Sequence, residues 1–181
     1  MGRRVHSREK GRAVSQTSLL DCGVTWRGIG LPEANAALEA WSHKMGGMHR
    51  PCAADVAAHG LLHDGRLVAV ACTAGLIRET VAGAPWLNRG NAVELARLCA
   101  DRTSLCRVAL RLWRVFTFPT FGRAYAVSYQ DADLHSGNTY RFDGWQRVSF
   151  ARAGGEDRRS GRKARNKWVW VWPPQNTKQS P

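Results

Sequence analysis

The chain has 181 residues and carries 27 lysines and arginines against 14 acidic residues, a formal net charge of +13. Apolar residues make up 44% of it, which excludes global disorder, and no apolar run is long enough for a transmembrane helix. Five cysteines without a C-x-x-C pair, and an N-terminus without an apolar signal segment, indicate a reduced, cytoplasmic protein with no membrane partner. The excess charge points to a polyanion, most commonly nucleic acid.

The positive charge is concentrated in two flanks. Residues 1–12 carry a net charge of +4 and residues 148–181 a net charge of +6, whereas residues 13–147 carry only +3. Solubility alone explains many such runs, but two separate runs favour contact with nucleic acid. The predicted organisation is, in chain order, a basic disordered arm (1–20), a folded domain (21–152), a basic loop (153–166), a terminal strand packing on the domain (167–173) and a disordered tail (174–181).

In the first half of the chain, helix and turn signals are clear. Pro32 suits the first turn of a helix, and Gly46-Gly47 ends the apolar pattern that follows it. Asp64-Gly65 is the pair that a two-residue type I′ hairpin turn prefers. The predicted elements are a strand at 24–29, a helix from Pro32 to about Lys44, a hairpin of 57–63 and 66–72, and a connection over 75–91.

The second half predicts alternating strands and helices. On its main helix, the arginines form a polar stripe and the apolar side chains Leu105, Val108, Leu112 and Val115 face inward. The predicted elements are a strand at 92–99, a helix capped by Thr103 or Ser104 that runs to about Phe116, a strand at 123–129, a short helix at 132–142, and strands at 145–150 and 168–172. This order predicts a single-domain α/β fold in which helices flank a mixed β-sheet.

The densest polar cluster lies between Ser128 and Tyr140, directly after a predicted strand. In open α/β sheets, ligands bind beyond the carboxyl ends of strands. Asp131 suits a general base or a metal ligand, Tyr140 a proton donor, and His135 either role. The alternative is an aspartate that caps a short helix beside a solvated histidine, and both interpretations stay open.

Two further sets of side chains precede this cluster. His43 lies near the end of the first helix, in a spacing that matches no structural zinc pattern, so it suits one half of an open metal site. Glu94 and Arg97 are three residues apart on a predicted strand, which places them on opposite faces unless the strand contains a bulge. A charge that faces solvent from a half-exposed strand is the alternative.

Three tryptophans alternate along the last predicted strand. Trp168, Trp170 and Trp172 share one face, and such a row more often packs in a core than forms a base-stacking surface. The chain has no Walker loop, nucleophile elbow or helical H-E-x-x-H, so a hydrolase or a nucleoside-triphosphate enzyme has no support.

The motifs Glu94-Leu95-Ala96-Arg97-Leu98, Val127-Ser128-Tyr129-Gln130-Asp131 and His135-Ser136-Gly137-Asn138-Thr139-Tyr140 resemble the Mom-type phage DNA-modification proteins. The basic, aromatic stretch from Arg162 to Trp168 is similar to the C-terminus of that family. The resemblance covers residues 33 to 172. It implies a GNAT-like fold and conversion of the adenine N6 amine in DNA to a carbamoylmethyl (acetamido-type) group, which protects phage DNA from restriction in the bacterial cytoplasm.

The resemblance also implies roles for individual residues, because an extruded adenine must be held while its weakly nucleophilic amine reacts. Asp131 would act as base or ligand, Arg97 as electrostatic stabiliser and Tyr140 as proton donor. Iron dependence is suggested for the family, with His43 and Asp131 as candidate ligands. The implied catalytic residues are His43, Arg97, Asp131 and Tyr140, and the predicted catalytic set adds Glu94, Ser128 and His135. The implied contacts to double-stranded DNA with a flipped adenine are Arg158, Arg159, Arg162, Lys163, Arg165, Lys167 and Trp168.

Two other functions stay open. An ordinary GNAT enzyme has a glycine-rich pyrophosphate loop, but residues 100–105 contain no glycine. Arg102, Thr103 and Ser104 would then bind the anionic part of a donor at a helix N-terminus, whether acetyl-CoA or another acyl or glycyl donor. The first rival function is a CoA-dependent N-acetyltransferase, and the second is a non-catalytic nucleic-acid-binding protein.

Overall fold

The computed structural model describes residues 17–18, 22–50, 54–152 and 165–174. Its strands are β1 (Thr17–Ser18), β2 (Val24–Ile29), β3 (Ala57–His63), β4 (Arg66–Gly75), β5 (Thr80–Val81), β6 (Ala84–Asn88), β7 (Ala92–Ala100), β8 (Tyr125–Asp131), β9 (Gln146–Ala151) and β10 (Lys167–Trp172). Its helices are α1 (Leu31–Ala40), α2 (Leu105–Leu112), the π-helix η1 (Trp113–Thr117), the 3-10 helix η2 (Phe118–Phe121) and α3 (Asn138–Phe142).

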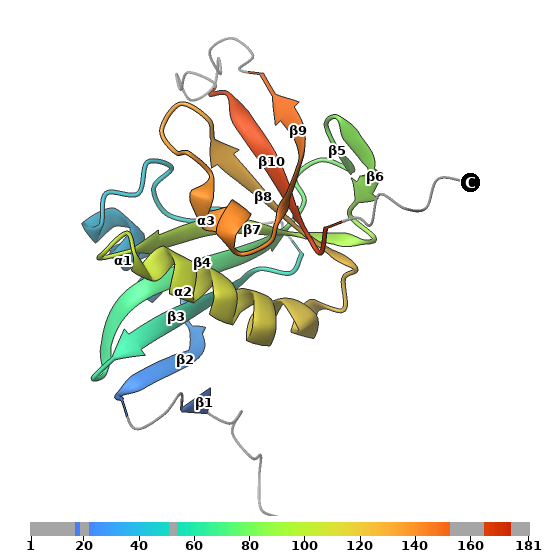
Figure 1. Cartoon of the computed structure of the whole chain (residues 1–181). Helices are drawn as coiled ribbons and strands as arrows, with labels where there is room; N and C mark the ends of the chain where they lie inside the picture. The colour runs from blue at the N-terminus through green and yellow to red at the C-terminus, as the bar shows by residue number, and fades with distance from the viewer. Residues whose placement is uncertain (1–16, 19–21, 51–53, 153–164, 175–181) are drawn as a thin grey trace, which may run out of the picture.

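The centre of the molecule is an eight-stranded sheet in the order β1-β2-β3-β4-β7-β8-β10-β9 (Figure 1). All of its neighbouring strands are antiparallel except β7 and β8, which run parallel. A separate two-stranded hairpin of β5 and β6 lies beside β8 and β10. The mixed sheet with flanking helices confirms the predicted α/β class.

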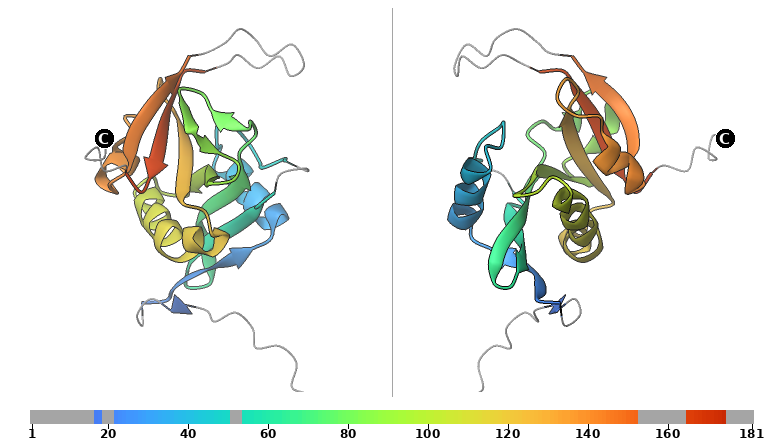
Figure 2. Two further views of the ribbon diagram at one scale, coloured as in Figure 1. Left: turned by 90° about the vertical axis from the view of Figure 1, so that its right-hand side faces the viewer. Right: turned by 60° about the vertical axis from the view of Figure 1, so that its left-hand side comes forward.

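The helices cover opposite faces of the sheet (Figure 2). α1 buries Ala34 and Leu38 against the β4 side chain Val70. α2 and η1 bury Leu110 and Trp113 on the other face, among side chains of β4 and β7. Burial of these large apolar side chains is the main favourable contribution to the fold, at about 25 cal/mol per Å² of apolar surface.

The β3–β4 hairpin confirms its prediction in detail. Asp64 and Gly65 both have positive φ, at 50° and 75°. A type I′ turn requires this conformation at both central residues, which asparagine, aspartate and glycine adopt most readily. The predicted strand at 24–29 is also confirmed, with the same bounds.

The first helix is shorter than predicted, because it ends at Ala40 and not near Lys44. Ser42 adopts a left-handed conformation with φ of 53°. The amide of Ser42 donates to the carbonyl of Glu39, and that of His43 to the carbonyl of Leu38. These two bonds form a Schellman motif, which closes the helix three residues before His43.

Predictions for the second half need three corrections. Val108 and Val115 are 44% and 47% exposed and do not face inward, because the buried face of the helix is centred on Leu110 and Trp113. Neither Thr103 nor Ser104 caps α2 through a side-chain bond, since the N-cap makes none. The helix predicted over 132–142 is limited to α3, because turn contacts hold the residues after Asp131. The predicted connection over 75–91 contains the β5–β6 hairpin.

The domain plan is only partly visible. β10 is inserted between β8 and β9, so the predicted terminal strand is an internal strand of the sheet. Thr17 and Ser18 pair with β2, so this part of the predicted arm is ordered. The rest of the arm, most of the basic loop and the tail lie outside the described residues. No helix in the described part of the chain is long and apolar enough to cross a membrane.

Candidate active site

The parallel strands β7 and β8 pair at one end and then separate. Their register runs from Ala92 opposite Tyr125 to Leu95 opposite Ser128, whereas β7 continues to Ala100 and β8 to Asp131. Within the described residues, the backbone of β7 beyond Leu95 therefore has no ladder with β8. We call the point of separation, at Leu95 and Ser128, the fork.

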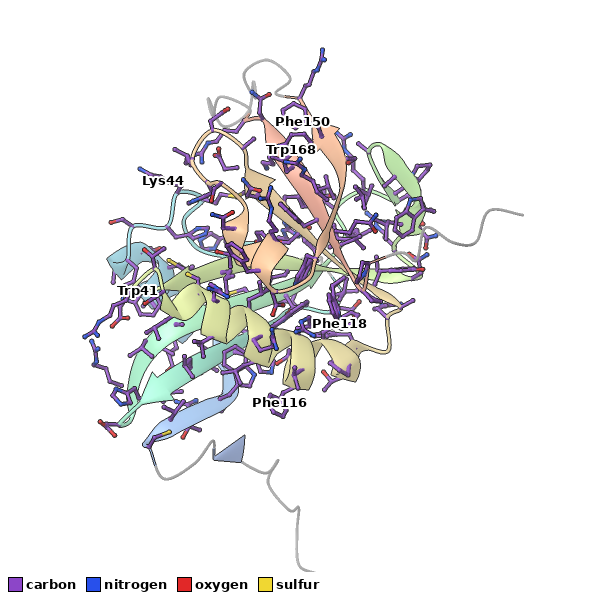
Figure 3. All side chains as sticks on the ribbon, viewed as in Figure 1. Trp41, Lys44, Phe116, Phe118, Phe150 and Trp168 are labelled. Atoms are coloured by element: carbon purple, nitrogen blue, oxygen red, sulfur yellow. The ribbon has the colours of Figure 1, made fainter. Side chains whose placement is uncertain are left out.

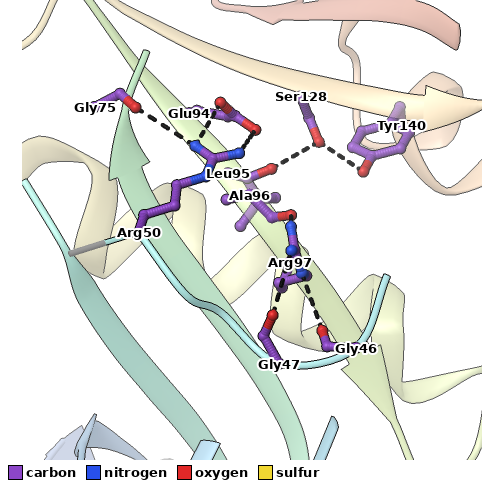
Figure 4. Close-up of polar contacts among 10 residues, drawn as sticks. All are labelled: Gly46, Gly47, Arg50, Gly75, Glu94, Leu95, Ala96, Arg97, Ser128 and Tyr140. Carbon is purple, nitrogen blue, oxygen red and sulfur yellow. Dashed lines mark hydrogen bonds and ion pairs between the residues drawn. The ribbon is translucent and has the colours of Figure 1, made fainter. Parts of the chain in front are cut away.

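Ser128 and Tyr140 meet at the fork (Figure 4). The buried Ser128 hydroxyl donates to the carbonyl of Leu95 at 3.0 Å and lies 2.8 Å from the phenol oxygen of Tyr140. Burial raises the pKa of Tyr140 to about 12, although the hydrogen bond with Ser128 opposes this shift. The Tyr140 phenol is therefore protonated at neutral pH and can give a proton to a reacting group.

Close packing holds Tyr140 in this position. Its ring stacks on Trp170 with centroids 5.6 Å apart and meets the edge of Trp145 at 5.5 Å. α3 begins after Gly137, whose φ is 79° and whose missing Cβ would lie 2.6 Å from the Trp170 ring. Only glycine suits this approach, so the local sequence sets the start of the helix that carries Tyr140.

A β-bulge in β7 brings Glu94 and Arg97 to one face of the sheet. The pairing with β4 shifts from Thr73 opposite Leu95 to Cys72 opposite Arg97, which leaves Ala96 without a partner in the register. The bulge is one of the two alternatives that the sequence left open, and it is the one observed. It places the Glu94 and Arg97 side chains on the side of the sheet that α1 covers.

The surroundings of Glu94 and Arg97 limit what each can do (Figure 4). Glu94 is 5% exposed, and both of its carboxylate oxygens accept hydrogen bonds from Arg50 at 2.8 Å. A carboxylate held in this way is a poor general base. Arg97 is buried and donates to the carbonyls of Ala96, Gly46 and Gly47, so it anchors the loop after α1 to β7.

His43 lies in this loop as a neutral imidazole. Burial, followed by the positive charges of Arg97, His135 and Arg165, lowers the pKa of His43 to about 4. Its Nδ1 accepts a hydrogen bond from the amide of Met45 at 3.3 Å. The single proton of the neutral ring is therefore on Nε2, which makes His43 a hydrogen-bond donor to a ligand.

Asp131 ends β8 and is bound on both carboxylate oxygens. Oδ1 accepts from the amides of Asp133 and Leu134 at 3.1 and 3.2 Å and closes a turn; it does not cap a helix as the alternative interpretation had it, because α3 begins only at Asn138. Oδ2 accepts from Arg165 at 3.1 Å. Arg165 also donates to the carbonyl of Lys44 at 3.4 Å, so it links the end of β8 to the loop that carries His43.

The predicted residues therefore form two groups. Ser128 and Tyr140 lie on the face that α2 and α3 cover, and Asp131, three residues along β8, points to the other face. His43 lies near Arg97, the exposed His135 and Arg165, whose charges lower its pKa, and Arg165 in turn pairs with Asp131. The fork separates the two groups.

Some predicted residues lie elsewhere. Arg102, Thr103 and Ser104 are exposed in the turn before α2. The neighbouring Asp101 pairs with Arg66 at 2.9 Å. Lys167 and Trp168 lie on β10, and Arg158, Arg159, Arg162 and Lys163 are outside the described residues.

Sequence reasoning missed the site role of three residues. The resemblance implies DNA contact for Arg165, but Arg165 pairs with Asp131 in the site. Arg50, the partner of Glu94, has no signal in its local sequence. Gln130 alternates with Ser128 on β8, which is a usable signal; it accepts from the Trp170 indole at 2.8 Å and donates to the carbonyl of His135.

The expected iron site does not fit these residues. The described residues contain no group of three or more His, Cys, Asp or Glu side chains that could hold a metal ion. Of the two candidate ligands, His43 uses Nδ1 to accept from an amide, and Asp131 uses both oxygens to accept from amides and Arg165. Asp131 is thus committed to hydrogen bonds within the protein, and His43 alone does not make an iron site.

Solved acetyltransferases have a similar structure. The ribosomal-protein-S18-alanine N-acetyltransferase from Escherichia coli matches with a TM-score of 0.55 at 15% identity, over 82% of this chain and 92% of that chain. The ribosomal-protein-S5-alanine acetyltransferase from Vibrio fischeri has a TM-score of 0.58 at 8% identity, over 93% and 100%. A probable GNAT-family acetyltransferase from Chromobacterium violaceum has a TM-score of 0.53 at 15% identity, over 82% and 86%. No protein-family profile and no curated protein sequence matches the chain.

The fold of this chain is therefore the GNAT fold, a single α/β domain in which helices flank a large mixed sheet. This confirms the predicted fold class and the GNAT-like fold that the resemblance implies. The Mom-type part is not confirmed by these matches. Identities this low establish the fold alone, so the activity must be inferred from the site.

Proposed function

We propose that this chain is a transferase that moves an acyl group from an activated donor, such as a thioester, to an amine nitrogen at the fork. The observation that carries the proposal is the protonated Tyr140, which Ser128 holds where β7 and β8 separate. The similarity in fold to acetyltransferases supports it.

The two groups of residues suit the two halves of this reaction. The amine nitrogen attacks the acyl carbon, the bond to the leaving group breaks, and the leaving group takes a proton from Tyr140. The amine loses a proton on the other side of the fork, where the Asp131 carboxylate is the candidate acceptor once the substrate displaces the exposed Arg165 from Oδ2. With the donor on the Tyr140 side and the amine on the Asp131 side, the two substrates meet between the strands.

The fork suits one part of the acyl donor, its extended arm, better than the pyrophosphate. The edge of β7 after Leu95 offers backbone groups to an extended, amide-containing donor arm, in the manner of an added strand. The turn before α2 suits a pyrophosphate less well, because residues 100–105 include Asp101 and no glycine. We therefore expect binding of acetyl-CoA to depend mainly on the arm and weakly on the phosphates.

The test is release of free thiol from acetyl-CoA in the presence of a panel of primary amines. Replacing Tyr140 with Phe removes the proton donor and keeps the ring packing, so the rate should fall by about 10²–10⁴-fold. Phe142→Leu, an exposed change on the same helix, is the matched control and should leave the rate unchanged. No thiol release with any amine or with DNA would overturn the proposal.

A second candidate function is that the amine is the adenine N6 of DNA. The observation in its favour is that His43, Arg97 and Asp131, which the Mom-type resemblance implies, gather with His135 on the amine side of the fork. An extruded adenine needs edge hydrogen bonds and charge stabilisation, which His43 Nε2 and Arg97 would supply. The chain's net charge of +13 suits a DNA substrate.

Mass spectrometry of nucleosides from a plasmid co-expressed with the protein tests this second function. We expect a modified adenosine, and its loss in the Asp131→Asn variant, whose side chain keeps its size but cannot take up the amine proton. An unmodified adenine pool from folded protein in a competent host contradicts the DNA substrate and leaves acyl transfer to other amines standing.

A further inference from the structure

An exposed aromatic and basic surface lies at the edge of the sheet. β9 is the last strand of the sheet, and its partner β10 is the neighbouring strand. Figure 3 shows Phe150 and Trp168 together near the ends of these strands. We define the edge surface by the described residues Arg147, Phe150, Arg152 and Trp168.

A second β-bulge builds this surface. The pairing of β10 with β9 shifts from Val169 opposite Ser149 to Trp170 opposite Arg147, so Val148 is the extra residue of the bulge and has no partner in the register. Arg147 and Phe150, three residues apart, therefore both contact Trp168. The guanidinium carbon of Arg147 lies 4.0 Å from the Trp168 ring centroid, and the Phe150 ring lies 4.5 Å from it at 55°.

The Phe150 ring is not used to build the core. Phe150 is 40% exposed, and Arg147 and Arg152 are exposed beside it. Arg147 is also 6.0 Å from the Trp170 ring, so two rings hold its planar group and leave its N–H groups available to an anion. The edge surface thus offers a preorganised aromatic face beside guanidinium groups.

The charge around this face has one sign. Residues 146–152 and 165–172 contain Arg147, Arg152, Arg165 and Lys167 and no aspartate or glutamate. Among the described residues, only Arg165 of these four forms an ion pair, with Asp131. A partner of this surface must supply both negative charge and flat groups that stack.

We propose that the edge surface binds single-stranded DNA, with a base on Phe150 and phosphates on Arg147 and Arg152. Unpaired bases present the flat face that an exposed phenylalanine needs, whereas a duplex hides it, and an acidic peptide would gain nothing from the ring. The role of this surface in catalysis rests on the second proposed function, in which it would hold the strand beside an extruded adenine. Binding itself does not depend on the transfer reaction.

Fluorescence anisotropy with a labelled single strand of about 12 nucleotides, in the absence of any acyl donor, tests the proposal. Phe150→Leu removes the stacking ring and should weaken binding by about fivefold to a hundredfold. The matched control is Phe116→Leu, because Phe116 is 41% exposed on η1, remote from the edge surface in Figure 3. The control should bind within twofold of the wild type.

A second variant tests the phosphate contacts. Arg147→Gln should reduce the slope of log affinity against log salt concentration by about 1. Equal binding by Phe150→Leu and Phe116→Leu, equal affinity for duplex and single strand, or full competition by polyglutamate would each overturn the proposal. If single-stranded DNA binds as expected but no modified adenosine forms, the binding proposal stands and the second function is contradicted. If modified adenosine forms but Phe150→Leu binds DNA as well as the wild type, the second function stands and the binding proposal is contradicted.

Discussion

Two aspartates near α3 are each held by arginine, and they differ in what surrounds them. Asp143 is buried and accepts from Arg111 at 2.6 Å, from Arg114 at 2.7 Å and from the Trp145 indole at 3.1 Å. Asp131 accepts from two turn amides and from Arg165. The side chain of Arg165 is 39% exposed, whereas Asp143 is held by one exposed arginine, Arg111 at 58%, and one largely buried arginine, Arg114 at 13%.

This difference in surroundings gives Asp143 a structural role and leaves Asp131 open to a role in the reaction. All partners of Asp143 come from α2, η1 and the turn after α3, so this carboxylate ties α3, and with it Tyr140, to the main helix. Asp131 keeps a solvent-accessible partner that a substrate can displace. An aspartate next to an arginine is therefore not by itself a catalytic signal; the exposure of the carboxylate side chain, 13% at Asp131 against 5% at Asp143, separates the two roles.

The largest expected effect is on stability at Asp143. Asp143→Ala leaves Arg114 with an uncompensated, largely buried charge, so the free energy of unfolding should fall by about 3–5 kcal/mol. Urea denaturation measures this change. A loss below about 1 kcal/mol would mean that the contact with Asp143 is no stronger than an exposed ion pair. It would contradict the structural role that distinguishes Asp143 from Asp131.

Asp131→Asn should have a small effect on stability and a large effect on activity. The asparagine carbonyl can still accept from the turn amides, and only an exposed ion pair is lost, so the free energy of unfolding should fall by at most about 1 kcal/mol. Transfer activity should nevertheless be lost, because the amide cannot accept the amine proton. Parallel urea and activity measurements on Asp131→Asn and Asp143→Asn separate the two roles, and intact activity in Asp131→Asn contradicts the proposed role of Asp131.

The pH dependence of stability offers a finer comparison. Burial alone would raise the pKa of Asp143, but hydrogen bonds from Arg114 and Arg111 outweigh it and hold this pKa below its usual value. Such a group stabilises the fold above its unfolded-state pKa of about 4 and loses that contribution as the pH falls through its folded-state pKa. Acid titration of stability should therefore be steeper in the wild type than in Asp143→Asn, and identical titrations would contradict the lowered pKa.

The smallest expected effect concerns Arg165. Its charge is one of the causes that lower the pKa of His43, after burial and the charges of Arg97 and His135. Arg165→Gln should raise the pKa of His43 from about 4 and change stability by less than about 1 kcal/mol. An NMR titration of the His43 ring measures the shift, and Arg165→Lys, which keeps the charge, is the control. An unchanged pKa in Arg165→Gln would place Arg165 outside the site.

Local sequence predicted the elements whose signals are local. The Asp64-Gly65 turn specifies its own backbone conformation, and the strand at 24–29 has the predicted bounds. The end of α1 escaped prediction, because a serine stands in the left-handed position where glycine is the usual signal. On α2, a few adjacent apolar residues allow more than one inward face, and only the packing of Trp113 selects it.

The sequence by itself therefore determined the α/β class, the hairpin and the presence of a polar cluster around Asp131. Only the tertiary structure decided how that cluster works, because a single extra residue in a strand reverses the faces of all the residues after it. The bulge at Ala96 places Arg97 on the same face as Glu94, and the bulge at Val148 places Phe150 and Arg147 beside Trp168. Arg165 reaches Asp131 across 34 positions of sequence, a contact that no local pattern encodes.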